Sequence, residues 1–302
     1  MSKRFGLIGA AGYIAPKHMA AIRDTGNILS VAMDPNDSVG ILDSYFPDCL
    51  FFKEIETLDR HIYRLSKTGE RIEYMSVCSP NYLHDSHIRL GLRNGCNVIC
   101  EKPLVINPEN IQYLKEVEKD TGRSVNTVLQ LRYHKAIKEL KEFYKDKSCS
   151  SKIKLNYITS RGNWYLRSWK GEVSKSGGLA ANIGIHFFDM LTWIFGEPKS
   201  SIVTDRSEDT IAGILTLNKA SVEWALSIDS SKLPEEVLRS GGRAFRSLEI
   251  DGREIDFSTG FTDLHTVTYQ NILRGQGFGL DDALPSLMLC RDIISGQDEV
   301  EY

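Results

Sequence analysis

Short apolar runs alternate with helix-like segments through the first 120 residues of the chain. Four runs of adjacent apolar residues, each ended by turn residues, predict buried strands at 5–8, 28–33, 74–78 and 98–100. Apolar residues at helical spacing predict helices after Ile14 and over 84–93 and 108–120. Alternating strands and helices build a parallel sheet covered on both faces, so we expect a doubly wound α/β domain over residues 1–121.

The second half of the chain has a different pattern of apolar and polar residues. After a β-rich run at 124–131, apolar and polar residues alternate in segments typical of half-buried strands: 152–159, 211–217, 221–228 and 245–250. Helical spacing occurs at 183–194, 264–273 and 281–295. We therefore expect an α+β domain with a mainly antiparallel sheet over 122–302, with the helix at 281–295 packing back on the first domain.

Composition and charge narrow the class of protein. The chain has 302 residues with 37 basic and 40 acidic side chains, a formal charge of −3, which argues against a nucleic-acid partner. Its apolar runs fall far short of the about 18 to 20 residues that span a bilayer, which argues against a membrane partner. The six cysteines include no CxxC pair, so neither a disulfide framework nor structural zinc is expected. These features favour a soluble globular protein with free thiols in a reducing compartment, and we expect a cytoplasmic location.

A glycine turn joins the first predicted strand to the first helix. Gly9 and Gly12 stand where a dinucleotide-binding fold needs a sharp turn that lets pyrophosphate reach the helix N-terminus. The G-x-G-x-x-G pattern is incomplete, because Ala11 and Ile14 occupy its second and third glycine positions. The position of the turn, between a strand and a helix, still predicts a Rossmann domain.

An acidic residue at the end of the second strand indicates which dinucleotide binds. Asp34 lies about 20 residues beyond the glycine turn, where a carboxylate accepts hydrogen bonds from the ribose hydroxyls. No Arg or Lys occurs from 35 to 40 to pair with a 2′-phosphate, so the expected cofactor is NAD. Alternatively, Asp34 only caps a turn, and Asp37 could replace it as the acidic residue.

Two further segments follow predicted parallel strands, at 79–87 and 101–104, where open α/β sheets bind ligands. His84 and His87 could ligate a metal, but no third ligand is evident, so helix-start packing near the cofactor is favoured and no metal is expected. Lys102 precedes a proline at a strand end, where its ammonium could bind a substrate hydroxyl; alternatively, it is a solvated surface lysine. We expect the cofactor to contact these residues: Gly9, Ala11, Gly12, Tyr13, Ile14, Asp34, Asn36, Ser79, Asn81, His84, Glu101, Lys102 and Gln130.

The chain resembles the glucose-fructose oxidoreductase, inositol dehydrogenase and rhizopine-catabolism (Gfo/Idh/MocA) family over nearly its whole length. The resemblance rests on the glycine turn, Ser79-Pro80-Asn81 with His84, Glu101-Lys102-Pro103, and the segment 177–189 that ends in His186-Phe187-Phe188-Asp189. It implies that Lys102 and His186 are catalytic. Asn182 stands where the family usually has Asp, so a carboxylate-assisted proton relay is not expected, and Asn182 is assigned to substrate orientation.

Within that family the chain is most similar to dehydrogenases that oxidise the C3 hydroxyl of UDP-N-acetylglucosaminuronate with NAD, on strings such as Arg161-Gly162-Asn163-Trp164-Tyr165 and Gly260 to His265. That nucleotide sugar carries phosphates, a carboxylate and a flat base, which call for cations and aromatic faces. Basic and aromatic residues in a sheet domain are also common on solvated surfaces and in cores. The expected substrate contacts are Lys102, Arg161, Tyr165, Trp169, Lys170, Lys175, Asn182, His186, Arg243 and Arg246.

The resemblance also implies a cellular context. It points to a homotetramer that supplies an aminotransferase in the synthesis of lipopolysaccharide O-antigen. Two alternatives stay open: a family dehydrogenase acting on another sugar or a cyclitol, and a non-catalytic NAD-binding sensor.

Overall fold

The computed structural model describes residues 2–148, 150–255, 260, 262–297 and 299–302. By their internal contacts these residues form two compact units. Unit 1 comprises residues 1–130 and 263–284, and unit 2 comprises 131–262 and 285–302. The last helix, α12 (Leu280–Ile294), passes from one unit into the other.

Unit 1 is built on a six-stranded parallel sheet with the order β3-β2-β1-β4-β5-β6. The strand order reverses between β1 and β4, which is the switch point where doubly wound sheets bind their ligands. The strands are β1 (Arg4–Ile8), β2 (Ile28–Met33), β3 (Leu50–Phe52), β4 (Tyr74–Val77), β5 (Asn97–Cys100) and β6 (Val125–Thr127).

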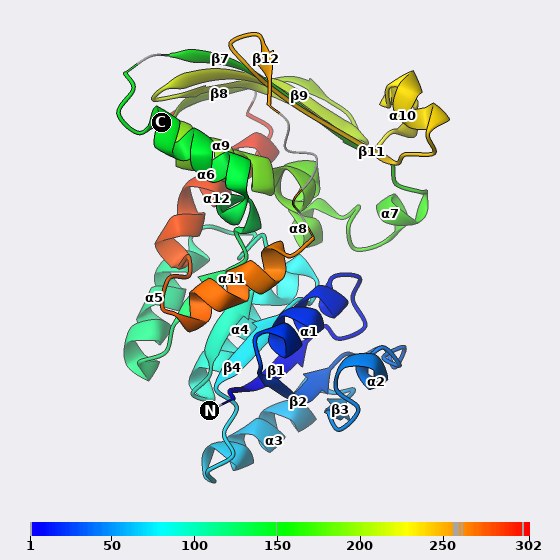
Figure 1. The fold of residues 1–302 in the computed structure, drawn as a ribbon, viewed down its shortest axis with the longest axis vertical. Helices are drawn as coiled ribbons and strands as arrows, with labels where there is room; N and C mark the ends of the chain where they lie inside the picture. Colours follow the sequence, from blue (N-terminus) through cyan, green and yellow to red (C-terminus); the bar gives the residue numbers. More distant parts are fainter. Residues whose placement is uncertain (1, 149, 256–259, 261, 298) are drawn as a thin grey trace. The chain divides into compact units, whose positions relative to one another are not determined.

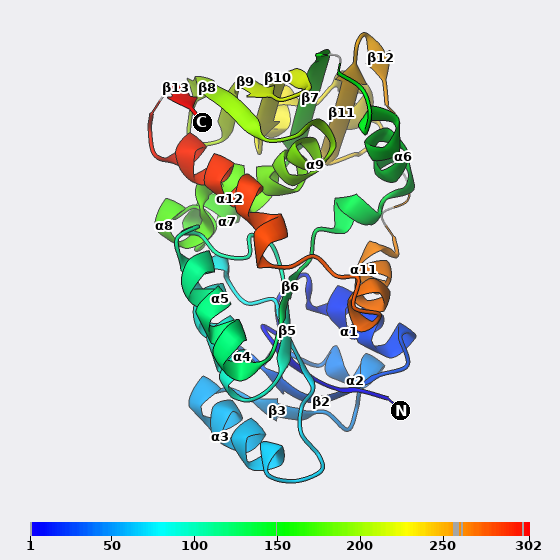
Figure 2. The same cartoon turned by 90° about the vertical axis from the view of Figure 1, so that its left-hand side faces the viewer.

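Helices cover both faces of the unit 1 sheet. In Figure 2, α4 and α5 lie on one face, and α1 and α11 lie side by side on the other. Both faces of the central strands are therefore buried, and Phe5, Leu7 and Val77 are fully inaccessible to solvent. The helices of this unit are α1 (Ala15–Asp24), α2 (Leu42–Tyr45), α3 (Ile55–Ser66), the 3₁₀ turn η1 (Asn81–Leu83), α4 (His84–Arg93), α5 (Asn110–Thr121) and α11 (Leu264–Leu273).

Unit 2 contains a seven-stranded mixed sheet with the order β12-β11-β7-β10-β9-β8-β13. Only β7 and β10 pair in parallel; the other neighbours are antiparallel. The strands are β7 (Ser151–Thr159), β8 (Pro198–Arg206), β9 (Thr210–Leu217), β10 (Ala220–Ser227), β11 (Ala244–Ile250), β12 (Arg253–Glu254) and β13 (Glu299–Glu301).

Helices α6 (Lys135–Tyr144) and α9 (Ile185–Phe195) lie against one face of this sheet (Figure 1). Their apolar side chains meet the inward residues of the strands, and the rings of Phe188 and Trp224 pack edge to face with centroids 5.1 Å apart. The remaining short helices are η2 (Gln130–Tyr133), α7 (Trp164–Arg167), α8 (Val173–Ser176), the π-helical turn η3 (Ala180–Gly184), η4 (Ser230–Lys232) and α10 (Glu235–Arg239).

One helical stretch, Val173–Phe195, is long and apolar enough by composition to cross a membrane. Of the most apolar 18-residue window within this stretch, however, 72 % is buried inside the protein. This is the behaviour of a core helix, because its apolar residues are already covered by the unit 2 sheet.

The fold class predicted from the sequence is confirmed in both units. The predicted helices at 84–93 and 264–273 have the same bounds in the structure. The predicted strand at 124–131 is wrong in length, because β6 ends at Thr127 and the chain turns into η2 from Gln130. The hydrophobic pattern did not predict β3, α3, α6 or β8.

Candidate active site

The glycine turn after β1 has the conformation that its sequence requires. Gly9 has a φ of +94°, and a Cβ atom added there would lie 2.6 Å from the backbone of Cys78 and Ser79. Its N–H donates to the carbonyl of Met33 at 2.8 Å, which ties the turn to the end of β2. Only glycine meets both constraints, so the turn brings the ends of β1, β2 and β4 together.

Asp34 holds the same turn from the end of β2. One carboxylate oxygen accepts a hydrogen bond from the backbone N–H of Ala11 at 3.0 Å, and the other accepts one from Asn36 at 2.9 Å. Asp34 therefore does cap a turn, but each carboxylate oxygen has a further lone pair for a ribose hydroxyl. Lys53, which the sequence analysis missed, forms an ion pair with Asp37 at 3.0 Å.

The helix that follows the turn is open at its N-terminus. Ile14 occupies the N-cap position of α1 and offers no side-chain cap, so the helix dipole faces the glycine turn. Tyr13 is 99 % exposed. An anionic group can therefore approach this end of α1 without displacing a side-chain cap.

The segments after β4 and β5 are linked through His84. Its two ring nitrogens lie 2.7 Å from the carbonyl oxygen of Pro103 and 2.8 Å from that of Ser79. Burial lowers the pKa of His84, although both carbonyls favour its protonated form. His87 lies 2.8 Å from the Ser79 hydroxyl, so both histidines hold the helix start in place, as expected from the sequence.

Glu101 is buried and accepts hydrogen bonds from three directions. Its Oε1 lies 3.1 Å from Nε2 of His18 and 2.9 Å from Nε2 of His265, and its Oε2 accepts the backbone N–H of Lys102 at 3.2 Å. Burial alone would raise the pKa of Glu101, but the two histidines outweigh it and hold that pKa well below its usual value. Glu101 was a candidate cofactor contact on sequence grounds, whereas neither histidine was a candidate site residue.

Lys102 is half-buried at the end of β5, and its peptide bond to Pro103 is cis. Gln130 and Asn81, two other expected cofactor contacts, lie at the ends of β6 and β4, respectively; Gln130 is half-buried and Asn81 is buried. Unit 1 thus gathers the expected cofactor contacts at the carboxyl ends of its strands, the edge where open parallel sheets bind ligands.

In unit 2 the candidate residues of the histidine motif begin α9 and the turn before it. Asn182 lies within the π-helical turn η3, and His186 lies in the first turn of α9; both are half-buried. The amide Nδ2 of Asn182 donates to the hydroxyl of Tyr165 at 2.5 Å. Tyr165 therefore fixes the orientation of the Asn182 amide.

Tyr165 differs from the expectation that it offers an aromatic face to substrate. Its ring is only 2 % exposed and packs with Ile183 and Ile228, so only the hydroxyl remains for polar contact. Trp169 keeps a half-buried ring, with the Lys170 ammonium 4.0 Å from its centroid.

Three of the expected cationic contacts, Arg161, Arg243 and Arg246, lie at the adjoining ends of β7 and β11, whereas Lys170 and Lys175 lie outside the strands. Arg161 and Arg243 are exposed, and the N–H of Ser160 donates to the Arg243 carbonyl at 2.8 Å, which places the two arginines on adjoining chain segments. Arg246 lies over the ring of Tyr157 at 5.3 Å. Lys175 forms an ion pair with Glu172 at 2.8 Å.

The chain matches two family models of known proteins. Residues 3–128 match the NAD-binding Rossmann fold of an oxidoreductase family named GFO_IDH_MocA, and residues 150–237 match the C-terminal alpha/beta domain of the same family. The chain belongs to this oxidoreductase family. The Gfo/Idh/MocA resemblance predicted from the sequence is thereby confirmed.

A dehydrogenase of known structure is similar to this chain over nearly its whole length. A WlbA (WbpB) dehydrogenase from Thermus thermophilus, solved in complex with NAD and UDP-GlcNAcA, is 47 % identical, with a TM-score of 0.93 over 97 % of this chain and 94 % of that chain. The same dehydrogenase has also been solved with NAD and alpha-ketoglutarate. These likenesses extend over both units.

Curated relatives are more distant. D-glucoside 3-dehydrogenase from Escherichia coli (strain K12) is 28 % identical over 45 % of this chain and 39 % of its own length. Glucose-6-phosphate 3-dehydrogenase from Bacillus subtilis (strain 168) is 24 % identical over 67 % of this chain and 56 % of its own length. The chain thus spans about half the length of the curated relatives it matches.

The residues of unit 1 fit the NAD of the Gfo/Idh/MocA family. The open N-terminus of α1 can hold a pyrophosphate, and Asp34 presents its carboxylate at the end of β2 for a ribose diol. Both groups stand at the switch point of the sheet.

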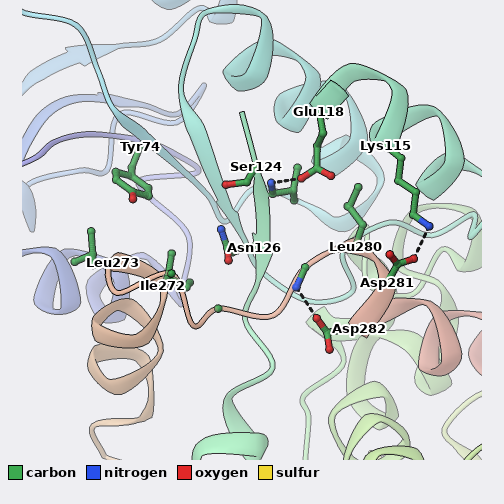
Figure 3. Close-up of a pocket in the computed structure, with 14 residues that line it drawn as sticks. Tyr74, Lys115, Glu118, Ser124, Asn126, Ile272, Leu273, Leu280, Asp281 and Asp282 are labelled. Atoms are coloured by element: carbon green, nitrogen blue, oxygen red, sulfur yellow. Dashed lines mark hydrogen bonds and ion pairs between the residues drawn. The ribbon is translucent and has the colours of Figure 1, made fainter. Parts of the chain in front are cut away.

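A cavity of about 640 Å³ in unit 1 lies away from these residues (Figure 3). Tyr74 and Ser124 in its wall mark the amino ends of β4 and β6, which is the edge opposite to the glycine turn. Its polar groups largely contact one another: Lys115 pairs with Asp281, and Asp282 accepts the N–H of Gly279. The candidate site residues are absent from its lining, so we assign this cavity no part in the reaction.

Proposed function

We propose that this chain is an NAD-dependent dehydrogenase that oxidises the C3 hydroxyl of UDP-N-acetylglucosaminuronate to a ketone. The observation that carries the proposal is the 47 % identity, over 97 % of this chain, to a dehydrogenase whose structure holds NAD and UDP-GlcNAcA. At that likeness over both units, the same class of nucleotide-sugar acid is the substrate that the chain fits best.

The cofactor contacts proposed are those of the glycine turn and the strand ends. The N-terminus of α1 would bind the pyrophosphate, and Asp34 would bind the ribose hydroxyls while repelling a 2′-phosphate. NAD supplies the hydride acceptor when bound. The part of the protein is then to orient the sugar and to remove a proton from its hydroxyl.

Proton removal is assigned to His186 and charge stabilisation to Lys102. The half-buried imidazole of His186 is suited to this role, because histidine is the side chain that most often acts as a general base. The Lys102 ammonium would donate a hydrogen bond to the same hydroxyl and stabilise the negative charge that develops on its oxygen. The two roles are coupled, because negative charge builds up on the hydroxyl oxygen of the sugar as its proton passes to His186.

Asn182 would orient the sugar without taking a proton. An amide does not act as a base, but its oxygen and remaining N–H can hold hydroxyl groups in a fixed direction. The hydrogen bond from Asn182 to Tyr165 supports this role, because it leaves the amide one orientation.

The charged part of the substrate would be bound by cations of unit 2. Arg161, Arg243 and Arg246 are proposed to bind the phosphates and the carboxylate, for which guanidinium forks are well matched. Lys170, Lys175 and Trp169 would contribute at the edge of the same region.

The proposed context is the cytoplasmic synthesis of lipopolysaccharide O-antigen by a homotetramer. A 3-keto nucleotide sugar is a substrate for transamination, so an aminotransferase is the partner that would consume the product. Free cysteines in the described residues agree with a reducing compartment.

The decisive experiment combines the purified protein, NAD and UDP-N-acetylglucosaminuronate, with and without 2-oxoglutarate. We expect NADH absorbance or, with 2-oxoglutarate, turnover to a sugar product lighter by two hydrogen atoms. Substrate deuterated at C3 should transfer its deuterium to the cofactor, whereas C4-deuterated substrate should not. Binding of NAD without hydride exchange would instead indicate a sensor, and turnover of an unphosphorylated sugar or cyclitol would indicate another family activity.

The catalytic assignment is tested by Lys102→Met and His186→Gln. Each should lower kcat by about 100-fold or more, because a positioned proton acceptor or charge-stabilising group contributes on that order. Lys115→Met is the matched control, since Lys115 is a unit 1 lysine in the remote cavity. Full activity in either site variant would refute the assigned roles.

A further inference from the structure

Five buried side chains of unit 1 form one continuous hydrogen-bonded network around Glu101. Ser76 of β4 contacts the hydroxyl of Tyr269 at 2.7 Å, and that hydroxyl lies 2.7 Å from Nδ1 of His18. His18 and His265 both reach Oε1 of Glu101, and all five residues are at most 8 % exposed. The network joins α1, α11, β4 and the end of β5.

The directions of these hydrogen bonds are determined by chemistry. Burial lowers the pKa of His18 and raises that of Tyr269 well above its usual value, so His18 is neutral and Tyr269 keeps its proton. The Tyr269 hydroxyl therefore donates to Nδ1 of His18, which leaves Nε2–H of His18 to donate to Glu101. The only assignment that satisfies Glu101 as an anion has both histidines and the Lys102 N–H donating to it.

The same three residues, His18, Glu101 and His265, are of types that bind metal ions, and their ligand atoms lie within 4.8 Å of one another. The separations of 2.9 and 3.1 Å are those of direct hydrogen bonds. Zinc would instead hold each ligand atom at about 2.0 to 2.2 Å from itself. The hydrogen-bonded chain already satisfies the carboxylate, so its geometry favours a positioned anion over a metal.

We infer that His18 and His265 are positioning residues, which hold Glu101 as a buried anion so that Glu101 fixes the backbone of Lys102. This inference rests on the proposed function, in which Lys102 acts on the sugar hydroxyl. Glu101 immediately precedes Lys102, and its Oε2 accepts the Lys102 N–H, so a shift of the carboxylate displaces the base of the lysine side chain. The position of Lys102 thereby depends on α11, which lies more than 160 residues later in the chain.

A matched pair of substitutions at His265 tests the network, because one keeps the hydrogen bond to Glu101 and the other removes it. In His265→Gln the amide nitrogen lies three bonds from Cβ, as Nε2 does in histidine, so it can still donate to Glu101. In His265→Asn the amide nitrogen lies one bond short of that position and cannot reach it. Both variants place a neutral amide at the same site, so they differ chiefly in the hydrogen bond.

We expect His265→Asn to lower kcat about 10-fold or more, with the KM for the sugar and the affinity for NAD changed less than about 3-fold. Loss of one donor should also raise the pH at which activity falls on the acid side, because protonation of Glu101 becomes easier. His265→Gln should restore kcat and the pH profile to near the parent values. Tyr269→Phe, which removes the donor to His18 and the partner of Ser76 but leaves both histidine bonds to Glu101, should give a smaller loss of the same kind.

The outcomes separate this inference from the proposed function. If Lys102→Met is inactive while His265→Asn folds and keeps the parent kcat and pH profile, the positioning role is refuted and the dehydrogenase assignment stands. If Lys102→Met is fully active, the proposed role of the lysine is refuted. Should His265→Asn fail to fold, Tyr269→Phe decides by the same readouts. Stoichiometric metal in the purified protein, with activity lost on chelation, would overturn the inference in favour of a metal site.

Discussion

Glu101 in unit 1 and Arg243 in unit 2 are both candidate site residues, but the protein holds them in opposite ways. Glu101 is 6 % exposed, and its two oxygens accept three hydrogen bonds from within unit 1. The backbone carbonyl of Arg243 accepts the N–H of Ser160, whereas its side chain is exposed among the residues that the structure describes. The fold therefore fixes the position of the Glu101 side chain, whereas the Arg243 side chain is available to a ligand.

The same contrast extends to the neighbours of these residues. Asp34 and His84 of unit 1 have partners at both polar ends, whereas Arg161 of unit 2 is exposed. Substitutions in the first group should change stability, cofactor binding or kcat. Substitutions in the second group should mainly change the KM for the substrate, because an exposed side chain contributes little to folding.

The largest effect is expected for Gly9→Ala. The added Cβ would collide with backbone atoms of Cys78 and Ser79 at 2.6 Å, in addition to the strain of a φ of +94°. We expect a loss of several kcal/mol in the free energy of unfolding, measured by chemical denaturation, and about 100-fold weaker NAD binding. Gly26→Ala is the control: Gly26 has a φ of +74° but no atom within 4 Å of an added Cβ, so it should cost only about 1 kcal/mol. Equal losses at the two sites would contradict the packing argument.

The second-largest effect is expected for an exposed arginine of unit 2. Arg243→Ala should raise the KM for the nucleotide sugar by about 10- to 100-fold and leave the melting temperature unchanged, since a charge-assisted contact contributes about 1.5 to 3 kcal/mol. Arg239→Ala serves as a control, because Arg239 is exposed on α10 and pairs with Glu235. Steady-state kinetics measure both variants. A loss of stability in Arg243→Ala without a change in KM would reverse the comparison.

Tyr165→Phe tests a part-buried contact of the candidate site in unit 2 that links α7 to the π-helical turn. The ring remains packed with Ile183, but the Asn182 amide loses its acceptor. We expect kcat to fall about 5- to 10-fold with little change in KM, as the amide becomes free to rotate. An unchanged kcat would show that Asn182 is oriented by other contacts.

The smallest effect concerns pH. Burial lowers the pKa of His87 to about 4, whereas an unfolded chain titrates near 6.5. Because the unfolded state binds the proton first, the free energy of unfolding should fall with decreasing pH, by about 1 kcal/mol between pH 6.5 and pH 5.5 from this residue. His87→Asn should flatten that part of the stability curve by the same amount. Burial lowers the pKa of His84 as well, so part of the slope should remain.

Much of the fold could be predicted from local patterns. The strands and helices that border the glycine turn carry strong hydrophobic periodicity, and β1, β2 and α4 lie where the pattern placed them. The strand β3 (Leu50–Phe52) was missed because only three residues pair, two of them half-buried, so its pattern is too short to read. The helix α6 begins at Lys135, in a stretch between the β-rich run at 124–131 and the strand at 152–159 for which no element was predicted.

The candidate site was predictable only where its residues share a motif. Glu101 and Lys102 are adjacent in a recognisable tripeptide, but His18 and His265 meet Glu101 through tertiary packing of α1 against α11. No spacing in the sequence indicates a contact between residues 247 positions apart. For the same reason the burial of Tyr165 could not be inferred, because its partners lie far away in the sequence, Ile183 in η3 and Ile228 just after β10. The division of the chain at residues 121 and 122 stays a prediction.

The π-helical turn at Ala180–Gly184 makes the direction of the Asn182 side chain depend on the number of residues in this segment. A π-helical turn holds one residue more than a regular α-helical turn, so every residue before it is rotated relative to α9 by about 100° compared with an uninterrupted helix. Deleting a single small residue such as Ala181 would leave a well-formed helix whose Asn182 amide points elsewhere. The number of residues between Gly177 and His186 therefore sets the direction of the Asn182 amide as much as the identity of the side chains does.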